Sequence, residues 1–134
     1  MIEKARAKVG DRQNVRLMVM DAQQMDFEDN TFDNVVTTCV FCSVPNPVQG
    51  LKEIRRVCKN GGKILMLEHV RSHKRGLGKF MDAINCIPLN VIGANINRET
   101  YRSLLDAGFS PQSIKVENLW LDIVKLIEID SQKL

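Results

Sequence analysis

The spacing of apolar residues predicts an alternation of helices and strands along the chain. Apolar residues recur at helical spacing in residues 1–8, and Gly10 provides a stop. Two runs rich in apolar and β-branched residues follow, 15–20 (VRLMVM) and 35–40 (VVTTCV), and each predicts a strand. A further run, 63–70 (KILMLEHV), predicts another strand. Near-continuous apolar strands of this kind are typical of a parallel sheet that is buried on both faces.

Between the last two of these strands the sequence predicts an amphipathic helix. Asn46 suits the N-cap and Pro47 suits the first helical position. The three residues 60–62 (NGG) predict a sharp turn before the next strand. The apolar stripe that this helix would bury consists of Val48, Leu51, Ile54, Val57 and Cys58.

The second half of the chain predicts a loop, an insertion and a last helix. Residues 71–78 are basic and contain glycine, as expected of a loop, and residues 79–92 predict a short amphipathic helix with an insertion. Asn97 would cap the next helix, which Gly108 would end. The residues expected to point inward from this helix are Tyr101, Leu104 and Leu105.

Residues 113–119 and 123–129 predict a closing antiparallel strand pair. The order of elements is that of the second part of an open α/β sheet in one domain. Ligands in such sheets bind beyond the carboxyl ends of the parallel strands. The positions to inspect are therefore 21–22, 38–44 and 68–71.

Composition narrows the class of protein. The 134 residues are 44% hydrophobic, which is enough for a packed core, and the formal net charge of +3 is mild and spread out, so no nucleic-acid partner is expected. No apolar run reaches the ~18 residues of a membrane span, so no transmembrane segment is predicted. The first eight residues, MIEKARAK, lack the apolar stretch of a secretory signal, which predicts a cytoplasmic protein.

Four cysteines raise the question of metal or redox chemistry. Cys39 and Cys42 form one CxxC, but Cys58 and Cys86 do not form the second pair that a zinc site usually has. Ordinary reduced cysteines are the favoured interpretation, and a CxxC redox protein is the disfavoured one. His73 lies four residues after His69 in a stretch typical of a loop, so no metal site is predicted.

Between residues 14 and 70 the chain carries short motifs in a fixed order. They are Asp21-Ala22, Asp26-Phe27, Thr31-Phe32-Asp33, Val44-Pro45-Asn46-Pro47 and Lys59-Asn60-Gly61-Gly62. In order and spacing they resemble the ubiquinone/menaquinone-biosynthesis type (methyltransferase type 11) of class I S-adenosylmethionine (SAM)-dependent methyltransferases. Residues 97–129 resemble this family more loosely. Asp26 and Asn60 stand where the family usually has proline.

The resemblance implies an incomplete Rossmann-like α/β fold, with a mostly parallel sheet and a C-terminal antiparallel strand pair. In the family, a glycine-rich loop surrounds the methionine part of SAM, and an acidic residue after the second strand binds the ribose hydroxyls. Both lie upstream of the family segment with which this chain begins. The resemblance therefore predicts a single partial domain, residues 1–134, in which the first βαβ unit with the glycine-rich loop is missing. Its cofactor would be SAM, with S-adenosylhomocysteine as the product.

By resemblance, three residues would contact the adenine of SAM. Asp21 would accept a hydrogen bond from the adenine amino group, and Ala22 would offer its backbone amide beside it. The alternative for Asp21 is a turn aspartate that caps the residues after it. Val44 would pack near the adenine or, equally, in the core.

The remaining site residues would lie near the methionine end of SAM and the acceptor. Thr38, Cys39 and Val40 would line the methionine end, with ordinary strand-end packing as the alternative. Methyl transfer from a sulfonium is an in-line displacement, and a base is needed only where the acceptor must lose a proton. His69, helped by Glu68, is the candidate base, and a structural histidine is the alternative.

The predicted function is SAM-dependent methyl transfer to a small-molecule acceptor. The segments 42–45 (CSVP) and 67–72 (LEHVRS) lean towards a lipid-like or thiol acceptor, and the apolar residues 80–92 would cover such an acceptor or cap the core. The alternative is a catalytically inactive, truncated remnant that acts as a binding or assembly module. Because the missing strands would leave sheet edges open, a homo-oligomer or a partner that covers them is a further hypothesis.

Overall fold

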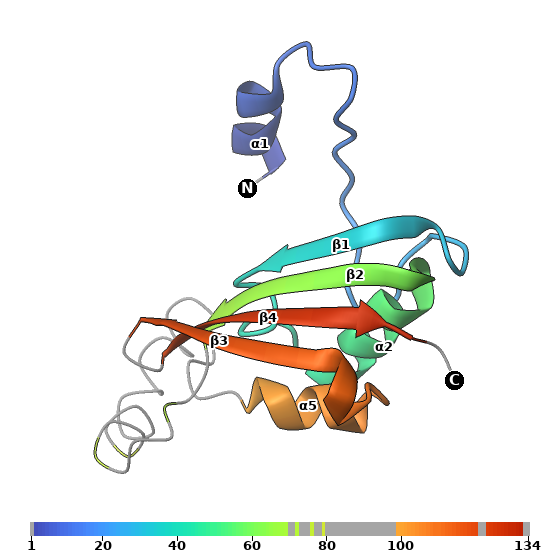
Figure 1. Ribbon diagram of the computed structural model, residues 1–134. Helices are drawn as coiled ribbons and strands as arrows, with labels where there is room; N and C mark the ends of the chain where they lie inside the picture. The colour runs from blue at the N-terminus through green and yellow to red at the C-terminus, as the bar shows by residue number, and fades with distance from the viewer. Residues whose placement is uncertain are drawn as a thin grey trace.

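The computed structural model describes residues 2–69, 72, 76, 79, 99–120 and 123–132 (Figure 1). Predictions for the loop at 71–78 and the insertion at 79–92 lie almost wholly outside these residues, as do those for His73, Cys86 and Asn97. The elements in chain order are α1 (Ile2–Val9), β1 (Phe32–Thr38), α2 (Pro47–Val57), β2 (Cys58–His69), α5 (Thr100–Asp106), the 3-10 turn η1 (Pro111–Ser113), β3 (Ile114–Trp120) and β4 (Val124–Ser131).

These strands form one four-stranded sheet in the order β1-β2-β4-β3. β1 pairs with β2 in parallel, whereas β4 is antiparallel to both β2 and β3. The predicted C-terminal antiparallel strand pair is therefore confirmed as β3 and β4. Across the described residues the sheet is mixed, with one parallel and two antiparallel pairings, rather than mostly parallel.

The strand predicted at residues 15–20 is wrong. This stretch is an irregular segment that runs from α1 towards the sheet (Figure 1). Its apolar side chains are largely open to solvent, with Val15 and Met18 each 41% exposed and Val19 79% exposed. A β-branched run becomes a strand only where a neighbouring strand accepts its backbone hydrogen bonds, and none lies beside this one within the described residues. Without this strand, β1–β2 is the one parallel pairing among the described strands.

Helix α2 forms as the sequence predicts. The Asn46 side chain accepts a hydrogen bond from the backbone N–H of Gln49 at 3.1 Å, and Pro47 occupies the first turn. Leu51 and Ile54 of the predicted stripe are 0% and 2% exposed. Burying each of these side chains contributes about 1.5–3 kcal/mol to folding. The helix thereby packs against β2 and fixes the loop that leads into it.

Helix α5 lies beside α2 on the same face of the sheet (Figure 1), but it buries a different stripe from the predicted one. Leu104 is fully buried as expected, whereas Tyr101 is 44% exposed and Leu105 is 37% exposed. The helix ends as predicted at Gly108, whose φ of +90° allows its N–H to bond the carbonyl of Leu105 at 2.9 Å. Its N-cap residue, Glu99, makes no side-chain capping bond.

The predicted turn at residues 60–62 is a bulge within β2. Phe32 pairs with Cys58 and Asn34 pairs with Lys63, so the bulge opposes a much shorter stretch of β1. Gly61 has a φ of +79°, which a residue with a side chain rarely adopts. The bulge lets β2 begin directly after α2, at a cysteine that sequence analysis had placed in the helix.

Alternation along the strands divides the sheet into a covered face and an open face. The covered face, which meets α2 and α5, carries the buried core residues Ile64, Met66, Ile127 and Ile129. The opposite face carries Val36, which is 69% exposed. No helix among the described residues is both long and apolar enough to cross a lipid bilayer.

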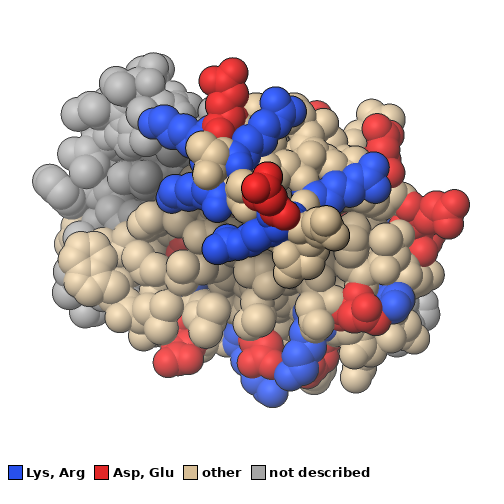
Figure 2. Space-filling model, turned by 90° about the horizontal axis from the view of Figure 1, so that it is seen from above, with Lys and Arg blue, Asp and Glu red and all other residues tan. Residues whose placement is uncertain are grey.

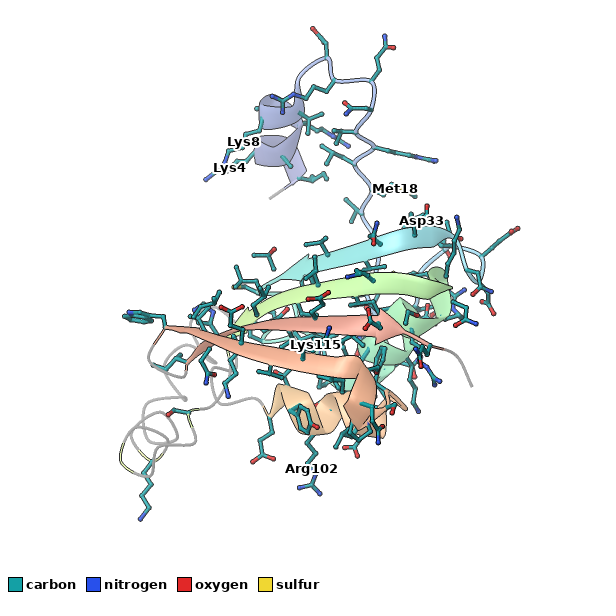
Figure 3. The ribbon with its side chains drawn as sticks, in the orientation of Figure 1. Lys4, Lys8, Met18, Asp33, Arg102 and Lys115 are labelled. Carbon is teal, nitrogen blue, oxygen red and sulfur yellow. The ribbon has the colours of Figure 1, made fainter. Side chains whose placement is uncertain are left out.

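The N-terminal helix stands apart from this sheet. α1 has no buried residue, and its Lys4 and Lys8 side chains project away from the strands (Figure 3). Figure 2 shows the molecule from above, the side on which α1 lies in Figure 1. Lys and Arg side chains gather there, with Asp and Glu side chains among them. The charge on this side is therefore mixed in sign.

Candidate functional site

The parallel strands β1 and β2 end at the same edge of the sheet, at Thr38 and His69. The backbone N–H of Cys39 makes the last ladder-like bond, to the carbonyl of Leu67 at 2.8 Å. Cys39 itself has a φ of +51°, a left-handed conformation that is uncommon for any residue other than glycine. The chain therefore turns sharply away from the sheet directly after β1, where a ligand of an open α/β sheet would bind.

The buried carboxylate of Glu68 binds the backbone of this turn. Glu68 is 1% exposed and accepts hydrogen bonds from the Thr37 hydroxyl at 3.2 Å, the Val40 N–H at 3.1 Å and the Phe41 N–H at 3.2 Å. Burial raises the pKa of Glu68, and these hydrogen bonds partly counteract the rise. The hydrogen bonds of Glu68 go to Thr37 and the turn, while His69 interacts with it through charge, so its predicted help to His69 stays a prediction.

A thiol and an imidazole meet at the same edge. The Cys39 Sγ atom lies 3.5 Å from His69 Nδ1, and both side chains are exposed. Partial burial raises the pKa of Cys39, with further contributions from the charge of Glu68 and from Cys42. The thiol is therefore protonated at neutral pH and is not an activated nucleophile.

The cysteines behave as ordinary thiols in the structure. Cys39, Cys42 and Cys58 are free, and the Cys42 Sγ donates to the Cys39 carbonyl at 3.2 Å. The part of the chain that the structure describes holds no group of three or more metal-ligating side chains.

Asp21 lies in a tight turn before the sheet. Its carboxylate accepts hydrogen bonds from the backbone N–H of Gln23 at 2.8 Å and from the Gln23 side-chain amide at 3.1 and 3.2 Å. Backbone and side-chain hydrogen bonds from Gln23 lower the pKa of Asp21, so its carboxylate is ionised at neutral pH. This geometry is that of a turn aspartate that caps the following residues, and it leaves the side chain exposed.

The Asp21 turn is joined to the start of α2. The Gln23 side-chain oxygen accepts from the Asn46 N–H at 2.8 Å, and the Gln49 side chain donates to the Gln23 carbonyl at 3.4 Å. One turn further along α2, a Cβ atom on Gly50 would lie 3.4 Å from the Ala22 carbonyl oxygen. The turn therefore sits directly over the N-terminal part of this helix.

Gly50 also brings together two residues that were predicted to lie near the adenine. A Cβ atom there would lie 3.0 Å from the Phe41 ring and 3.6 Å from Val44 Cγ1, in addition to its approach to Ala22. Val44 is 8% exposed and belongs to the core. Ala22 and Val44, which lie far apart in sequence, thus meet around one glycine of α2.

Arg56 of α2 holds the segment that follows the Asp21 turn. Its guanidinium donates to the carbonyls of Met25 at 2.9 Å and Phe27 at 2.6 Å, and it pairs with the carboxylates of Glu53 and Asp29 at 2.9 Å. Glu53 in turn accepts from the Met25 N–H at 2.8 Å. Sequence analysis did not identify this network, although the i, i+3 spacing of Glu53 and Arg56 was a signal for it.

The structure thus groups the predicted site residues into two clusters. Ala22 and Val44 meet around Gly50, and Cys39 meets His69 beyond the strand ends. Val40 is half-buried beside the core, whereas Thr38 is exposed and faces away from α2.

Glu68 is the residue of the site whose position sequence analysis missed. The signal was present, because Ile64, Met66 and Glu68 alternate along β2 and therefore share its covered face.

Comparison with known proteins shows which protein family this chain resembles. Residues 1–66 match the sequence profile of the methyltransferase domain family. A phosphatidylethanolamine N-methyltransferase of Cereibacter sphaeroides is 36% identical over 87 residues, which are 63% of this chain and 43% of that protein. A demethylmenaquinone methyltransferase of Staphylococcus aureus is 40% identical over 68 residues, which are 51% of this chain and 28% of that protein. The chain spans less than half the length of these curated relatives.

Solved structures support the same class of fold. A SAM-dependent methyltransferase of Thermotoga maritima superposes with a TM-score of 0.71 at 18% identity, covering 98% of this chain and 71% of its own. A protein of Bacillus halodurans assigned as a methyltransferase gives a TM-score of 0.74 at 17% identity, covering 98% of this chain and 79% of its own. The chain is thus similar in sequence and in fold to the class I SAM-dependent methyltransferases, as its motifs predicted. The cofactor that this class implies is SAM.

Proposed function

We propose that this chain takes part in SAM-dependent methyl transfer to a small, lipid-like acceptor. The observation that best supports the proposal is the meeting of Ala22 and Val44 around Gly50, next to the Cys39–His69 pair at the ends of two parallel strands. By resemblance, Ala22 and Val44 are adenine positions, Cys39 lies at the methionine end and His69 lies on the acceptor side. The match of residues 1–66 to the methyltransferase domain profile supports the same reading.

The residues of this chain fit the adenine part of the cofactor. The ionised Asp21 carboxylate is exposed and accepts hydrogen bonds, as a partner for an exocyclic amine must. Ala22 supplies a small apolar group of the kind that a flat purine ring packs against, whereas Val44 lies in the core beside it. Backbone groups of residues 38–40 would lie along the methionine end. SAM would supply the electrophilic methyl group, and this chain's residues would orient it and exclude water.

His69 would act on the acceptor side. The Cys39 sulfur lies 3.5 Å from Nδ1. For His69 to act as a base, Nδ1–H would donate to this sulfur, which would leave Nε2 free to take a proton. An oriented imidazole can take a proton from an acceptor hydroxyl, amine or thiol as the methyl group is transferred. In-line displacement otherwise depends on positioning, so His69 matters only for acceptors that must lose a proton.

The names of the relatives support a lipid-like acceptor. One relative is named for a phospholipid amine and another for a quinone precursor, and both names describe amphipathic lipids. A thiol acceptor is the competing choice from sequence. Transfer of labelled methyl groups to lipid or to thiol substrates distinguishes these two acceptor classes.

Cofactor binding is tested first. We expect the purified chain to bind S-adenosylhomocysteine in isothermal titration, and Asp21→Ala to weaken that binding about tenfold through loss of one charge-assisted hydrogen bond. Asp33→Ala is the matched control, because Asp33 is also exposed but lies at the opposite end of β1 (Figure 3). Absence of binding to the wild-type chain would refute the proposed function.

Acceptor choice is tested with tritiated SAM. Phosphatidylethanolamine vesicles, a demethylated quinol and an aliphatic thiol are offered in separate reactions. We expect label in a lipid fraction and a loss of rate in His69→Gln. Label confined to the thiol would refute the lipid assignment while leaving methyl transfer intact.

An oligomer that covers the sheet edges remains part of the proposal. β1 and β3 are the outer strands of the described sheet, and Val36 of β1 and Trp120 of β3 are 69% and 62% exposed. Unpaired outer strands are ready to pair with another chain. We expect light scattering to give a mass above 15.2 kDa, and a monodisperse monomer would count against this part of the proposal.

A further inference from the structure

We infer that Glu68 is a positioning residue, whose carboxylate holds the turn at residues 39–41 in the shape that presents it to the cofactor. The inference rests on the proposed function for its ligand, but the geometry of the turn stands independently of it. Glu68 contributes no atom to the exposed surface where a ligand would bind, since it is 1% exposed. Its influence must therefore pass through the groups that it bonds.

The carboxylate bonds three donors that belong to the end of β1 and the turn after it. Its Oε1 atom accepts from the Thr37 hydroxyl and the Val40 N–H at 3.2 and 3.1 Å, and its Oε2 atom accepts from the Phe41 N–H at 3.2 Å. These donors are 27 to 31 residues away from Glu68 in sequence. One side chain of β2 thus fixes, through hydrogen bonds, the backbone that follows the neighbouring strand β1.

The backbone of the turn explains why such a tie is needed. The left-handed φ of +51° at Cys39 turns the chain out of the β1–β2 ladder. The N–H groups of Val40 and Phe41 can then no longer bond a strand, although both residues are packed against or within the core. Buried N–H groups require an acceptor, and the two oxygens of Glu68 supply one for each.

The turn is coupled to the adenine side through Phe41. The Phe41 ring is 1% exposed and closes on Gly50, beside the Ala22 carbonyl and Val44. A shift of the Phe41 backbone would therefore move the wall that Ala22 and Val44 form together. Through this contact Glu68 influences both clusters of the site without touching a ligand.

The chemistry of the group follows from its partners. Three donors converge on it, so an acceptor-only side chain is required. A glutamine of nearly the same shape would offer one oxygen and one NH₂ group, which would place a donor against at least one donor of the turn. Glu68→Gln therefore disturbs the turn with little change in volume.

The experiment compares wild type, Glu68→Gln and the control Glu128→Gln. Glu128 lies on the adjacent β4 strand and forms an exposed ion pair with Lys63 at 2.9 Å, so the control removes a carboxylate from the same sheet outside the site. Hydrogen exchange reports on the Val40 and Phe41 amides, titration with S-adenosylhomocysteine gives affinity, and urea unfolding shows that each protein is folded under the assay conditions. We expect Glu68→Gln to speed exchange at both amides and weaken binding, each about tenfold, and the control to change neither.

The outcomes separate positioning from general stability. If Glu68→Gln lowers stability but its folded fraction binds and exchanges like wild type, the role is structural alone and the inference is overturned. If the wild-type chain does not bind the ligand, the proposed function fails, and unchanged exchange in the variant would then overturn the positioning role as well. If Glu68→Gln does not fold, wild-type exchange decides, because Val40 and Phe41 amides as fast as those of an unstructured peptide would refute the assignment.

Discussion

Replacing Arg56 by lysine is expected to loosen the segment before β1 while keeping the charge of the chain. The Arg56 guanidinium bonds the carbonyls of Met25 and Phe27 and the carboxylates of Glu53 and Asp29 at 2.6 to 2.9 Å. These bonds use the planar fork of the guanidinium in several directions at once. A lysine ammonium is a single point of charge and can satisfy only part of this set.

The size of the effect follows from the partners. The two bonds to main-chain carbonyls contribute about 1 kcal/mol each. The bidentate pair with Glu53, whose side chain is 12% exposed, contributes about 1–2 kcal/mol. Asp29 is 67% exposed, so solvent reduces its contribution to little. Because lysine recovers one of these bonds, we expect Arg56→Lys to lower the free energy of unfolding by about 2–3 kcal/mol.

Urea unfolding followed by circular dichroism measures this loss. Arg102→Lys on α5 is the matched control, since Arg102 points into solvent (Figure 3), and we expect it to stay within about 0.5 kcal/mol of wild type. A double-mutant cycle with Glu53→Gln isolates the pair from the carbonyl bonds. A loss for Arg56→Lys no larger than that for Arg102→Lys would refute the reasoning.

Three further expectations concern stability. Gly62→Ala should lower the free energy of unfolding by about 2 kcal/mol or more, because its Cβ would collide with a β1 carbonyl oxygen. A Cβ on Gly61 meets nothing within 4 Å, so Gly61→Ala should lower it by about 1 kcal/mol, for the φ of +79° alone. Equal losses in urea unfolding would contradict this. Since the folded pKa of Glu68 is raised, its favourable contribution is complete below pH ~4.5 and is lost as the pH rises through the folded pKa. Carboxylates whose pKa is lowered, such as Asp21, act in the opposite direction, so the test is the difference in free energy of unfolding between wild type and Glu68→Gln, which should fall as the pH rises above ~4.5. Leu104→Ala should cost about 2–5 kcal/mol and Leu105→Ala under about 1 kcal/mol, and the reverse order would mean that α5 is rotated.

Elements with local signals were predictable from sequence. The cap at Asn46, the proline after it and the left-handed glycine at Gly108 each act within a few residues, so the sequence contains all that determines them. The stripe on α2 followed because it is long and regular.

The errors arose where a neighbour decides the structure. Residues 15–20 have the composition of a strand, but strand formation depends on a partner that single-sequence patterns do not reveal. On α5 the buried positions are Thr100, Leu104 and Ala107, at spacings of four and three. A threonine and an alanine in that stripe made it less visible than the larger Tyr101 and Leu105.

The sequence predicted where in the sheet the candidate site lies better than it predicted the contacts of its residues. The rule that ligands bind beyond the ends of parallel strands predicted this edge, where the structure brings Cys39 and His69 together, and the role of the edge stays a prediction. It could not show that Glu68 turns inward to bind the backbone, since that depends on the left-handed residue Cys39, which follows β1 and lies far from Glu68 in sequence. A buried carboxylate within an apolar strand is the feature that sequence alone could have flagged.

The register of β2 against β4 affects how the chain tolerates changes in length after β2. His69 pairs with Val124, so the strand that ends the candidate site is clamped along its length by a partner from the far end of the chain. Closing a flexible connection costs only about 0.6 kcal/mol more for a doubling of its length, so a longer chain between β2 and α5 would weigh little against this pairing. The turn under Glu68 and the His69 edge would keep their positions through such changes. The pairing of β2 with β4 thus separates the position of the strand ends from the length of the chain that follows them.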